Sequence, residues 1–157
     1  MQVKIRPLVE LDAYTSYKWR NDPEVFKYTG NTYQHEITIE SELNWIRRVM
    51  SNNDEVRCAI LVDDVYVGNI YLTGISEGNA WFHIFIGDRN YWGKGIAKKA
   101  SQLMFEYATS KLGLKSIQLS AHPENISAIN LYSSLGFEKN DIKNGRQVMT
   151  LNLMENL

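Results

Sequence analysis

The sequence has little of what several classes of protein require. It carries one cysteine and three prolines in 157 residues, so a disulfide within the chain is excluded. Lysine and arginine number 17 against 18 aspartates and glutamates, which argues against a nucleic-acid binder that works through a broad basic surface. We find neither a signal peptide nor an apolar run long enough to span a membrane, so we expect a cytoplasmic protein with no membrane partner.

What is present is the composition of an ordinary globular domain. Apolar residues make up 44% of the chain and charged residues 22%. No repeat or low-complexity linker divides the sequence, and we expect one domain over residues 1–157. Strand and helix patterns alternate, which predicts an α/β (α+β) fold with a single twisted, mixed and mostly antiparallel sheet flanked by helices. Asp63-Asp64 and Asn144-Gly145 are predicted to turn two hairpins.

The stretch of residues 80–111 organises the chain. Residues 81–86 are aromatic, β-branched or tolerant of a pleat, which predicts a strand. Residues 96–108 place apolar side chains on one helical face. Between them, the Gly-Lys-Gly of residues 93–95 removes Cβ atoms at the start of a helix whose first amides lack acceptors. We interpret this junction as a phosphate pocket with Lys94 adding charge, the alternative being a strand-to-helix turn without a ligand.

Other phosphate-binding motifs fit this junction poorly. A P-loop needs Ser or Thr where Gly95 stands, and a glycine five residues before Gly93. A dinucleotide fingerprint needs a third glycine where Lys98 stands. The chain also lacks the H-R-D and D-F-G motifs of protein kinases. These three kinds of nucleotide site are therefore disfavoured.

Two motifs resemble one known family. The segment RNYWGKGIAKKA (residues 89–100) resembles the acetyl-CoA signature [QR]-x-x-G-x-[GA] of the GNAT superfamily of N-acetyltransferases. Trp92 replaces the usual Gln or Arg, and an aromatic residue there is familiar in the RimJ/RimL-like branch. Residues 125–137 read N-x-x-A-x-x-x-Y-x-x-x-G-F, a second motif of the superfamily at the expected distance. The resemblance covers almost the whole chain.

The resemblance implies the GNAT fold and acetyl-CoA as the cosubstrate, with no metal. In that fold the strand ending near Ile86 and the strand ending near Ala121 separate, and acetyl-CoA lies in the gap. Backbone groups around Phe85 and Ile86 would pair with the pantetheine arm. Asn125 also suits the N-cap of its helix. The implied coenzyme-binding residues are Phe85, Ile86, Trp92, Gly93, Lys94, Gly95, Ile96, Ala97, Asn125 and Ala128.

Acetyl transfer to an amine needs a neutral nucleophile, a stabilised oxyanion and a proton for the departing thiolate. Tyr132 occupies the tyrosine place of the second motif, which implies that its phenol serves the coenzyme sulfur; a tyrosine that only covers the core is the alternative. Many relatives have a glutamate where this chain has Trp81, so the base stays open. His83 shares a strand face with Trp81 and has a suitable pKa. We name His83 as candidate base, beside a structural role or a water chain.

The acceptor site is implied to lie under residues 19–33 and the helix after them. Residues 19–22 (Trp-Arg-Asn-Asp) resemble the opening of enzymes that acetylate amino sugars on nucleotide carriers, and of RimJ/RimL-type protein N-terminal acetyltransferases. Arginine can reach a phosphate or carboxylate, and aromatics such as Tyr33 can stack on a sugar or base. The predicted substrate-binding residues are Arg20, Asn21, Tyr28 and Trp81.

We therefore expect an acetyl-CoA-dependent N-acetyltransferase that moves the acetyl group directly to a primary amine. The acceptor is expected to be a nucleotide-linked amino sugar or a protein N-terminus, and the enzyme a monomer or homodimer. Because residues 22–42 include several acidic residues, a polyamine or another small amine is an alternative acceptor. A non-catalytic acyl-CoA-binding regulatory module is the alternative from another class, prompted by Trp81.

Overall fold

The computed structural model describes residues 1–28 and 35–156 of the chain. Tyr33, one of the aromatics named above, lies outside the described residues. The strands are β1 (Val3–Pro7), β2 (Val56–Val62), β3 (Val65–Ser76), β4 (Asn79–Ile86), β5 (Ser116–Ala121), β6 (Glu138–Lys143) and β7 (Arg146–Asn152). The helices are α1 (Ala13–Arg20), α2 (Ile39–Met50), α3 (Ile96–Ser110) and α4 (Ile126–Ser134), with short 3₁₀ turns at Glu10–Asp12, Arg89–Tyr91 and Leu153–Asn156.

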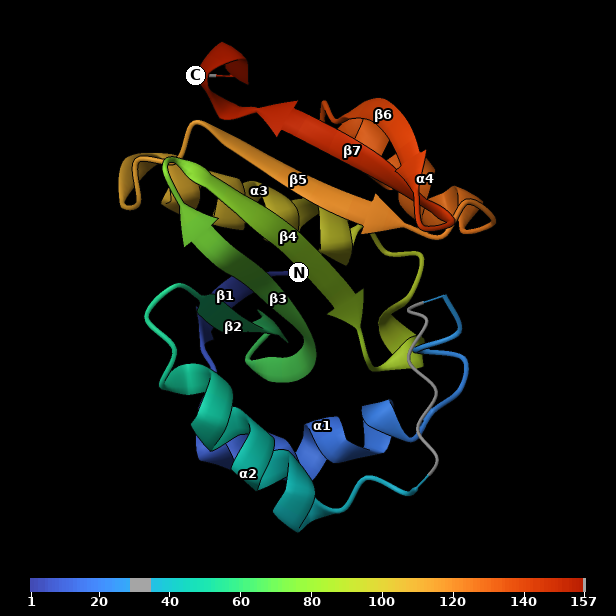
Figure 1. The fold of residues 1–157 in the computed structure, drawn as a ribbon. Coiled ribbons are helices and arrows are strands. Elements are labelled where there is room, and N and C mark those ends of the chain that lie inside the picture. The colour runs from blue at the N-terminus through green and yellow to red at the C-terminus, as the bar shows by residue number, and fades with distance from the viewer. Residues whose placement is uncertain (29–34, 157) are drawn as a thin grey trace.

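The described strands form one sheet in the order β1-β2-β3-β4-β5-β7-β6 (Figure 1). The pair β4–β5 is parallel and the other neighbouring pairs are antiparallel. The predicted mixed, mostly antiparallel sheet is therefore confirmed. Both predicted hairpin turns have positive φ at their two central residues, Asp63-Asp64 and Asn144-Gly145, as a type I′ turn requires.

The parallel pair holds together at one end only. Its register joins Asn79 to Ser116 and ends where Trp81 faces Gln118. Beyond that point the carboxyl ends of β4 and β5 diverge (Figure 1). This separation opens the middle of the sheet at the edge where both strands end.

Each face of the sheet is covered by different helices. The apolar stripe of α3 buries Ile96, Ala100 and Met104, each at most 1% exposed, against the main core. Figure 1 shows α3 behind β4 and β5 and the pair α1–α2 on the other side of the sheet. A smaller cluster on that side contains Leu8, Ala59 and Tyr71, with Trp45 of α2 packed against it. The helical periodicity of residues 96–108 thus sets the position of α3.

Buried contacts fix α1 on the end of β4 and on α2. A Cβ atom at Gly87, just after β4, would lie 2.0 Å from the Trp19 ring, so only glycine allows this close approach. Glu42 of α2 is 2% exposed, and its carboxylate accepts hydrogen bonds from Ser16 (2.7 Å) and Arg20 (3.0 Å) of α1. These contacts orient the end of α1 toward the opening between β4 and β5.

Candidate active site

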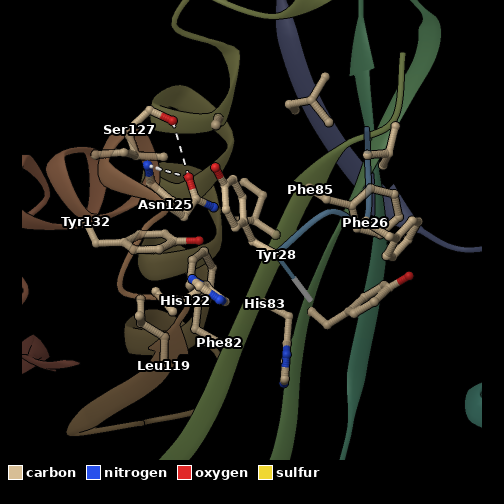
Figure 2. Close-up of a pocket in the computed structure, with 18 of the residues that line it drawn as sticks. Phe26, Tyr28, Phe82, His83, Phe85, Leu119, His122, Asn125, Ser127 and Tyr132 are labelled. Carbon is tan, nitrogen blue, oxygen red and sulfur yellow. Dashed lines mark hydrogen bonds between the residues drawn. The ribbon is translucent and has the colours of Figure 1, made fainter. Parts of the chain in front are cut away.

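A cavity of about 1160 Å³ occupies the opening between β4 and β5. One side of its wall comes from the end of β4, the loop after it and the first turn of α3. The opposite side comes from the end of β5, residue His122 and α4. Figure 2 shows Asn125 and Tyr132 on the α4 side and Phe85 on the β4 side of this space. A third part of the wall comes from α1, α2 and β2.

A phosphate cradle, defined here as Gly93, Lys94, Gly95 and the first turn of α3, lines one part of the cavity. Gly93 and Gly95 have φ of +74° and +76°, and no atom lies within 4 Å of where their Cβ atoms would be. No side chain caps the 15-residue helix α3 at Gly95. Free amides, the positive end of the helix dipole and Lys94 therefore meet beside open space, which fits a phosphate-bearing group.

Trp92 fastens the phosphate cradle to β4. Its indole Nε1–H donates a hydrogen bond of 2.8 Å to the Ile86 carbonyl, and the ring is 44% exposed. This carbonyl, which was expected to pair with a ligand's amide arm, is thus already used by the chain itself. The sequence pattern gave no sign of this bond.

On the opposite side, α4 presents an amide and a phenol. The Asn125 side chain accepts from the Ala128 amide (3.3 Å), so the predicted N-cap is confirmed. Tyr132 lies further along α4. Its ring packs against Phe82 and Phe137, and its hydroxyl points toward the cavity (Figure 2). Burial raises the pKa of Tyr132 to about 12, partly offset by the cation of Arg146. At neutral pH the group is therefore a phenol that can donate a hydrogen bond.

The part of the cavity next to α2 is an arginine–aromatic end, formed by Arg20, Trp45, Arg57 and Tyr71. The Arg20 guanidinium lies 3.9 Å from the centre of the Trp45 ring, and that of Arg57 lies 4.4 Å from the centre of the Tyr71 ring. Arg57 also pairs with Glu55 at 3.0 Å, and this bond lowers the pKa of Glu55 below its usual value. Glu55 is therefore an ionised carboxylate whose charge is already matched.

His83, on β4, lines the cavity between the phosphate cradle and the arginine–aromatic end. A hydrogen bond of 2.9 Å joins its Nε2 atom to the Thr73 hydroxyl. The ring is open to the cavity, yet desolvation by the cavity walls, together with Arg57, lowers the pKa of His83 to about 4, and Glu55 opposes this shift. At neutral pH the ring is an uncharged hydrogen-bonding group rather than a half-protonated one.

The predicted site residues fall into two groups. All ten predicted coenzyme-binding residues, with Tyr132, His83, Arg20 and Tyr28, line the same cavity. Asn21 and Trp81 do not belong to the wall given by the described residues. The Asn21 side-chain amide instead donates to the Tyr17 and Ile37 carbonyls and accepts from the Ile37 amide. It thereby ties the end of α1 to the segment just before α2. Trp81 stands near the paired end of β4 and β5, away from the opening.

Four residues that line the cavity were not predicted from the sequence: Glu55, Arg57, Tyr71 and Arg146. Arg57 carried a signal, since it is the one charge within the otherwise apolar strand β2, and a charge in such a strand needs a partner. Arg146 follows directly on the predicted Asn-Gly turn, and its contacts join segments 118 residues apart, which no local pattern reveals.

Among residues 1–28 and 35–156, no group of three or more His, Cys, Asp or Glu side chains is arranged to hold a metal ion. Within the same residues, no helix is both long and apolar enough to cross a membrane.

Comparison with known proteins gives a consistent result. The model of the family described as "Acetyltransferase (GNAT) domain" matches residues 2–138. The chain is 27% identical over 152 residues to the uncharacterized N-acetyltransferase p20 of Bacillus licheniformis, covering 88% of this chain and 80% of that protein. It is 29% identical over 137 residues to the spermidine N(1)-acetyltransferase of Escherichia coli K12, covering 86% and 72%. A third relative, the uncharacterized protein MJ1062 of Methanocaldococcus jannaschii, is much longer, and the match covers 30% of it.

Solved structures share the fold. A spermidine N-acetyltransferase of Vibrio cholerae, solved with CoA and spermine, superposes with a TM-score of 0.86 at 22% identity, over 98% of this chain and 96% of the other. RimJ of Mycobacterium smegmatis, solved with CoA-disulfide, superposes with a TM-score of 0.88 at 17% identity, over 98% and 83%.

Proposed function

The chain belongs to the GNAT acetyltransferase family, and from that premise we propose that it acetylates the primary amine of an amino sugar carried on a nucleotide. It is an N-acetyltransferase with acetyl-CoA as its cosubstrate, and the open phosphate cradle fits that molecule. The proposal concerns the acceptor, the RimJ/RimL-like branch and the residue roles. We treat residues 1–157 as one catalytic domain, acting as a monomer or homodimer.

The charge of the cavity carries the proposal for the acceptor. Among the described residues, six cations line the cavity (Arg20, Lys27, Arg57, Lys94, Lys98 and Arg146), against Glu24 and Glu55. Arg20 and Arg57 are paired with Glu42 and Glu55, so the excess of positive charge over Glu24 comes from Lys27, Lys94, Lys98 and Arg146. A polyamine bears several positive charges, and a cavity with excess cations repels it. A phosphate-bearing acceptor meets the opposite sign. The aromatic rings of Trp45 and Tyr71 suit the faces of a sugar or base.

Of the acidic residues among residues 22–42, Asp22 and Glu42 are held in ion pairs or hydrogen bonds, and Glu55, outside that range, is paired as well. Glu42 is buried and bound by Ser16 and Arg20. Asp22 pairs with Arg89 at 3.0 Å. Glu55 lies in the cavity, where Arg57 matches its charge. These pairings leave Glu24 as the cavity carboxylate with no ion pair among the described residues.

The residue roles follow from the two halves of the cavity. We assign the phosphate cradle to the coenzyme pyrophosphate, and Asn125, Ala128, Phe85 and Ile86 to the walls around its arm. We assign the arginine–aromatic end to the acceptor, whose amine reaches the thioester between Tyr132 and His83. The amine nitrogen attacks the thioester carbonyl, the carbon–sulfur bond breaks, and the Tyr132 phenol gives its proton to the departing thiolate.

The new amide nitrogen must lose a proton in the same sequence of events. A base with a pKa near 4 is weak at neutral pH, since general bases work best with a pKa near the operating pH. We therefore assign to His83 the role of a neutral hydrogen-bonding group that orients the amine, while cavity water carries the amine's proton to the Tyr132 phenolate. The proton balance closes, because one proton leaves the amine and one reaches the thiolate.

Two other acceptors have support of their own. Relatives named as spermidine acetyltransferases favour a polyamine, and the likeness to RimJ favours a protein N-terminus. The structural likenesses lie below 25% identity and carry the fold alone. The cavity charges are a property of this chain, and we give them more weight.

Thiol release from acetyl-CoA tests the proposal. Separate reactions contain a nucleotide-linked amino sugar, spermidine, or a peptide with a free N-terminus. We expect release to be fastest with the amino sugar, with a product heavier by one acetyl group in its mass spectrum. Release with spermidine alone would overturn the acceptor, and silence with all three despite bound acetyl-CoA would overturn the proposed reaction.

A further inference from the structure

A strap, defined here as residues 22–28, leaves the end of α1 and crosses the cavity. Its first residue, Asp22, pairs with Arg89 at 3.0 Å beside the phosphate cradle. In its middle, the Phe26 ring lies 5.1 Å from the Phe85 ring of β4, measured between centres. At its far end, the Tyr28 ring lies 5.3 Å from the His122 ring. The strap therefore touches both sides of the opening between β4 and β5.

Tyr28 occupies a central place in this arrangement. Figure 2 shows its ring between Asn125 and Tyr132 on the α4 side and Phe85 on the β4 side. Glu24, Phe26 and Tyr28 all line the cavity. The position of the strap thus determines how wide the passage is between the phosphate cradle and the arginine–aromatic end.

One side chain from the other end of the sequence holds this end of the strap. The Nη1 atom of Arg146, the first residue of β7, donates to the Tyr28 carbonyl at 2.9 Å. Its Nε and Nη2 atoms donate to the hydroxyl and the carbonyl of Ser120 at 3.2 and 3.3 Å. A single guanidinium therefore joins the strap to β5.

The Ser120 end of this link is rigid. Ser120 lies within the β5–β7 register, where it faces Val148, and the pairing continues to Ala121 facing Gln147. Among the described residues the backbone bonds of the strap are those of local turns, such as the Val25 amide to the Asp22 carbonyl. Arg146 therefore joins a segment held by local turns to a strand held in a ladder, and its planar fork of donors suits two carbonyls and a hydroxyl at once.

We propose that Arg146 is a positioning residue, a latch that fastens the strap to β5 and thereby sets the passage through which the acceptor amine reaches the thioester. The latch rests on the proposed function, because that function assigns the arginine–aromatic end, from which the passage leads, to the acceptor amine. Arg146 touches neither reacting group in this role. It acts through Tyr28, whose ring lies against His122.

The charge of Arg146 also supports its proposed role. The charged and titratable groups of the cavity wall on the α4 side are Arg146, His122, Tyr28 and Tyr132, and the Arg146 cation lowers the pKa of Tyr132 against the effect of burial. A guanidinium latch thus also places a positive charge near Tyr132, a direct effect that is separate from its hold on Tyr28 and that Arg146→Lys keeps. An uncharged latch would lack this second effect.

Kinetics of three variants test the latch. Arg146→Met removes the fork and the charge, Arg146→Lys keeps the charge without the fork, and Lys143→Met is the control in the same hairpin. We expect Arg146→Met to raise the acceptor KM roughly tenfold to hundredfold, the range of a charged hydrogen bond, while the acetyl-CoA KM changes less than about twofold. Arg146→Lys should recover part of the loss, and Lys143→Met should behave as the wild type.

Hydrogen–deuterium exchange of the free protein provides a readout that needs no substrate. Exchange at residues 22–28 should rise in Arg146→Met and stay unchanged in Lys143→Met, with unfolding temperatures kept equal within about 3 °C. Unchanged exchange with a raised acceptor KM would make Arg146 a direct substrate ligand and overturn the latch. If the Met variant unfolds, Arg146→Gln, which retains a donor, replaces it under the same criterion.

A double-mutant cycle separates the latch from independent roles. If Arg146 acts by holding Tyr28, then Arg146→Met and Tyr28→Ala should cost less together than the sum of their separate effects on acceptor kcat/KM. Additive effects would contradict the latch. If the wild type acetylates none of the amines offered, the proposed acceptor fails, and the exchange experiment still decides whether the latch exists.

Discussion

The two halves of the cavity are built in different ways. The phosphate cradle consists of consecutive residues, from Gly93 into the first turn of α3, and works through backbone amides and the absence of Cβ atoms at Gly93 and Gly95. The arginine–aromatic end consists of side chains from α1, α2, β2 and β3, which lie up to 51 residues apart, from Arg20 to Tyr71. A site formed by backbone groups is encoded by one continuous segment of the sequence. A site formed by side chains from separate elements depends on how those elements pack.

The largest expected effect is on kcat and comes from replacing Tyr132, which we place where the two halves of the cavity meet. Tyr132→Phe removes the proton that we assign to the thiolate and leaves the ring packing against Phe82 and Phe137. We expect kcat to fall by roughly 10²-fold or more, with the acetyl-CoA dissociation constant nearly unchanged. Stopped-flow thiol release and calorimetric titration measure the two quantities. Equal turnover in the variant would show that Tyr132 only covers the core.

The second effect is confined to the phosphate cradle. Gly95→Val places a β-branched side chain at φ +76°, which strains the backbone and obstructs the first amides of α3. We expect acetyl-CoA to bind roughly tenfold more weakly or worse, since a lost hydrogen bond to a charged group costs about 1.5–3 kcal/mol.

Gly113→Val is the matched control for this variant. Gly113 has φ +63° and open space around its Cβ position, as Gly95 does, but it lies outside the cavity wall. Both variants should lower the unfolding temperature, and only Gly95→Val should weaken acetyl-CoA binding in calorimetric titration. Equal coenzyme affinity in the two variants would remove the cradle from the account.

The third effect is confined to the arginine–aromatic end. Arg57→Met breaks the pair with Glu55 and the contact with Tyr71. We expect the acceptor KM to rise roughly tenfold, in the range of one charge-assisted contact, with the acetyl-CoA KM unchanged. Steady-state kinetics in both substrates checks this. Arg47→Met, an exposed arginine paired with Glu10 at the surface, is the control and should leave both KM values unaltered.

The smallest expected effect concerns stability against pH. The folded state lowers the pKa of His83 from 6.5 to about 4, so between these values the unfolded chain binds more protons than the folded one. The free energy of unfolding should therefore fall as pH falls from 6.5 to 4. Because His83 is exposed to solvent, which screens the interaction, we expect about 1 kcal/mol from this group.

Urea unfolding at a series of pH values measures this effect. His83→Gln should have a flatter curve between pH 6.5 and 4 than the wild type, with the two curves parallel above pH 7. A variant whose curve keeps the full slope of the wild type would show that His83 does not carry the lowered pKa.

The contrast between the halves also explains what the sequence could predict. The sheet, the hairpins at Asp63-Asp64 and Asn144-Gly145, and the amphipathic helix α3 follow from local periodicity and turn chemistry. The cradle residues could be named because their spacing is a single motif. Strand alternation placed His83 on the correct face, but not its low pKa, which depends on the walls and on Arg57.

The rest depended on contacts that no local pattern contains. Asn21 was expected to bind substrate, yet its amide closes the loop around Ile37. Trp81 shares a strand face with His83, but the strands are still paired at its level and leave no opening there. The Arg146 link to Tyr28 spans 118 residues of sequence. Such features become visible only when the chain is folded.

A competition experiment tests the central claim most directly. The enzyme is given a nucleotide-linked amino sugar and spermidine at equal concentrations with limiting acetyl-CoA, and both acetylated products are quantified by mass spectrometry. The product ratio is the ratio of the two kcat/KM values. The cationic cavity predicts that the acetylated amino sugar predominates by roughly tenfold or more, as one opposed charge pair suffices for such a ratio. A predominance of acetylspermidine would contradict the account.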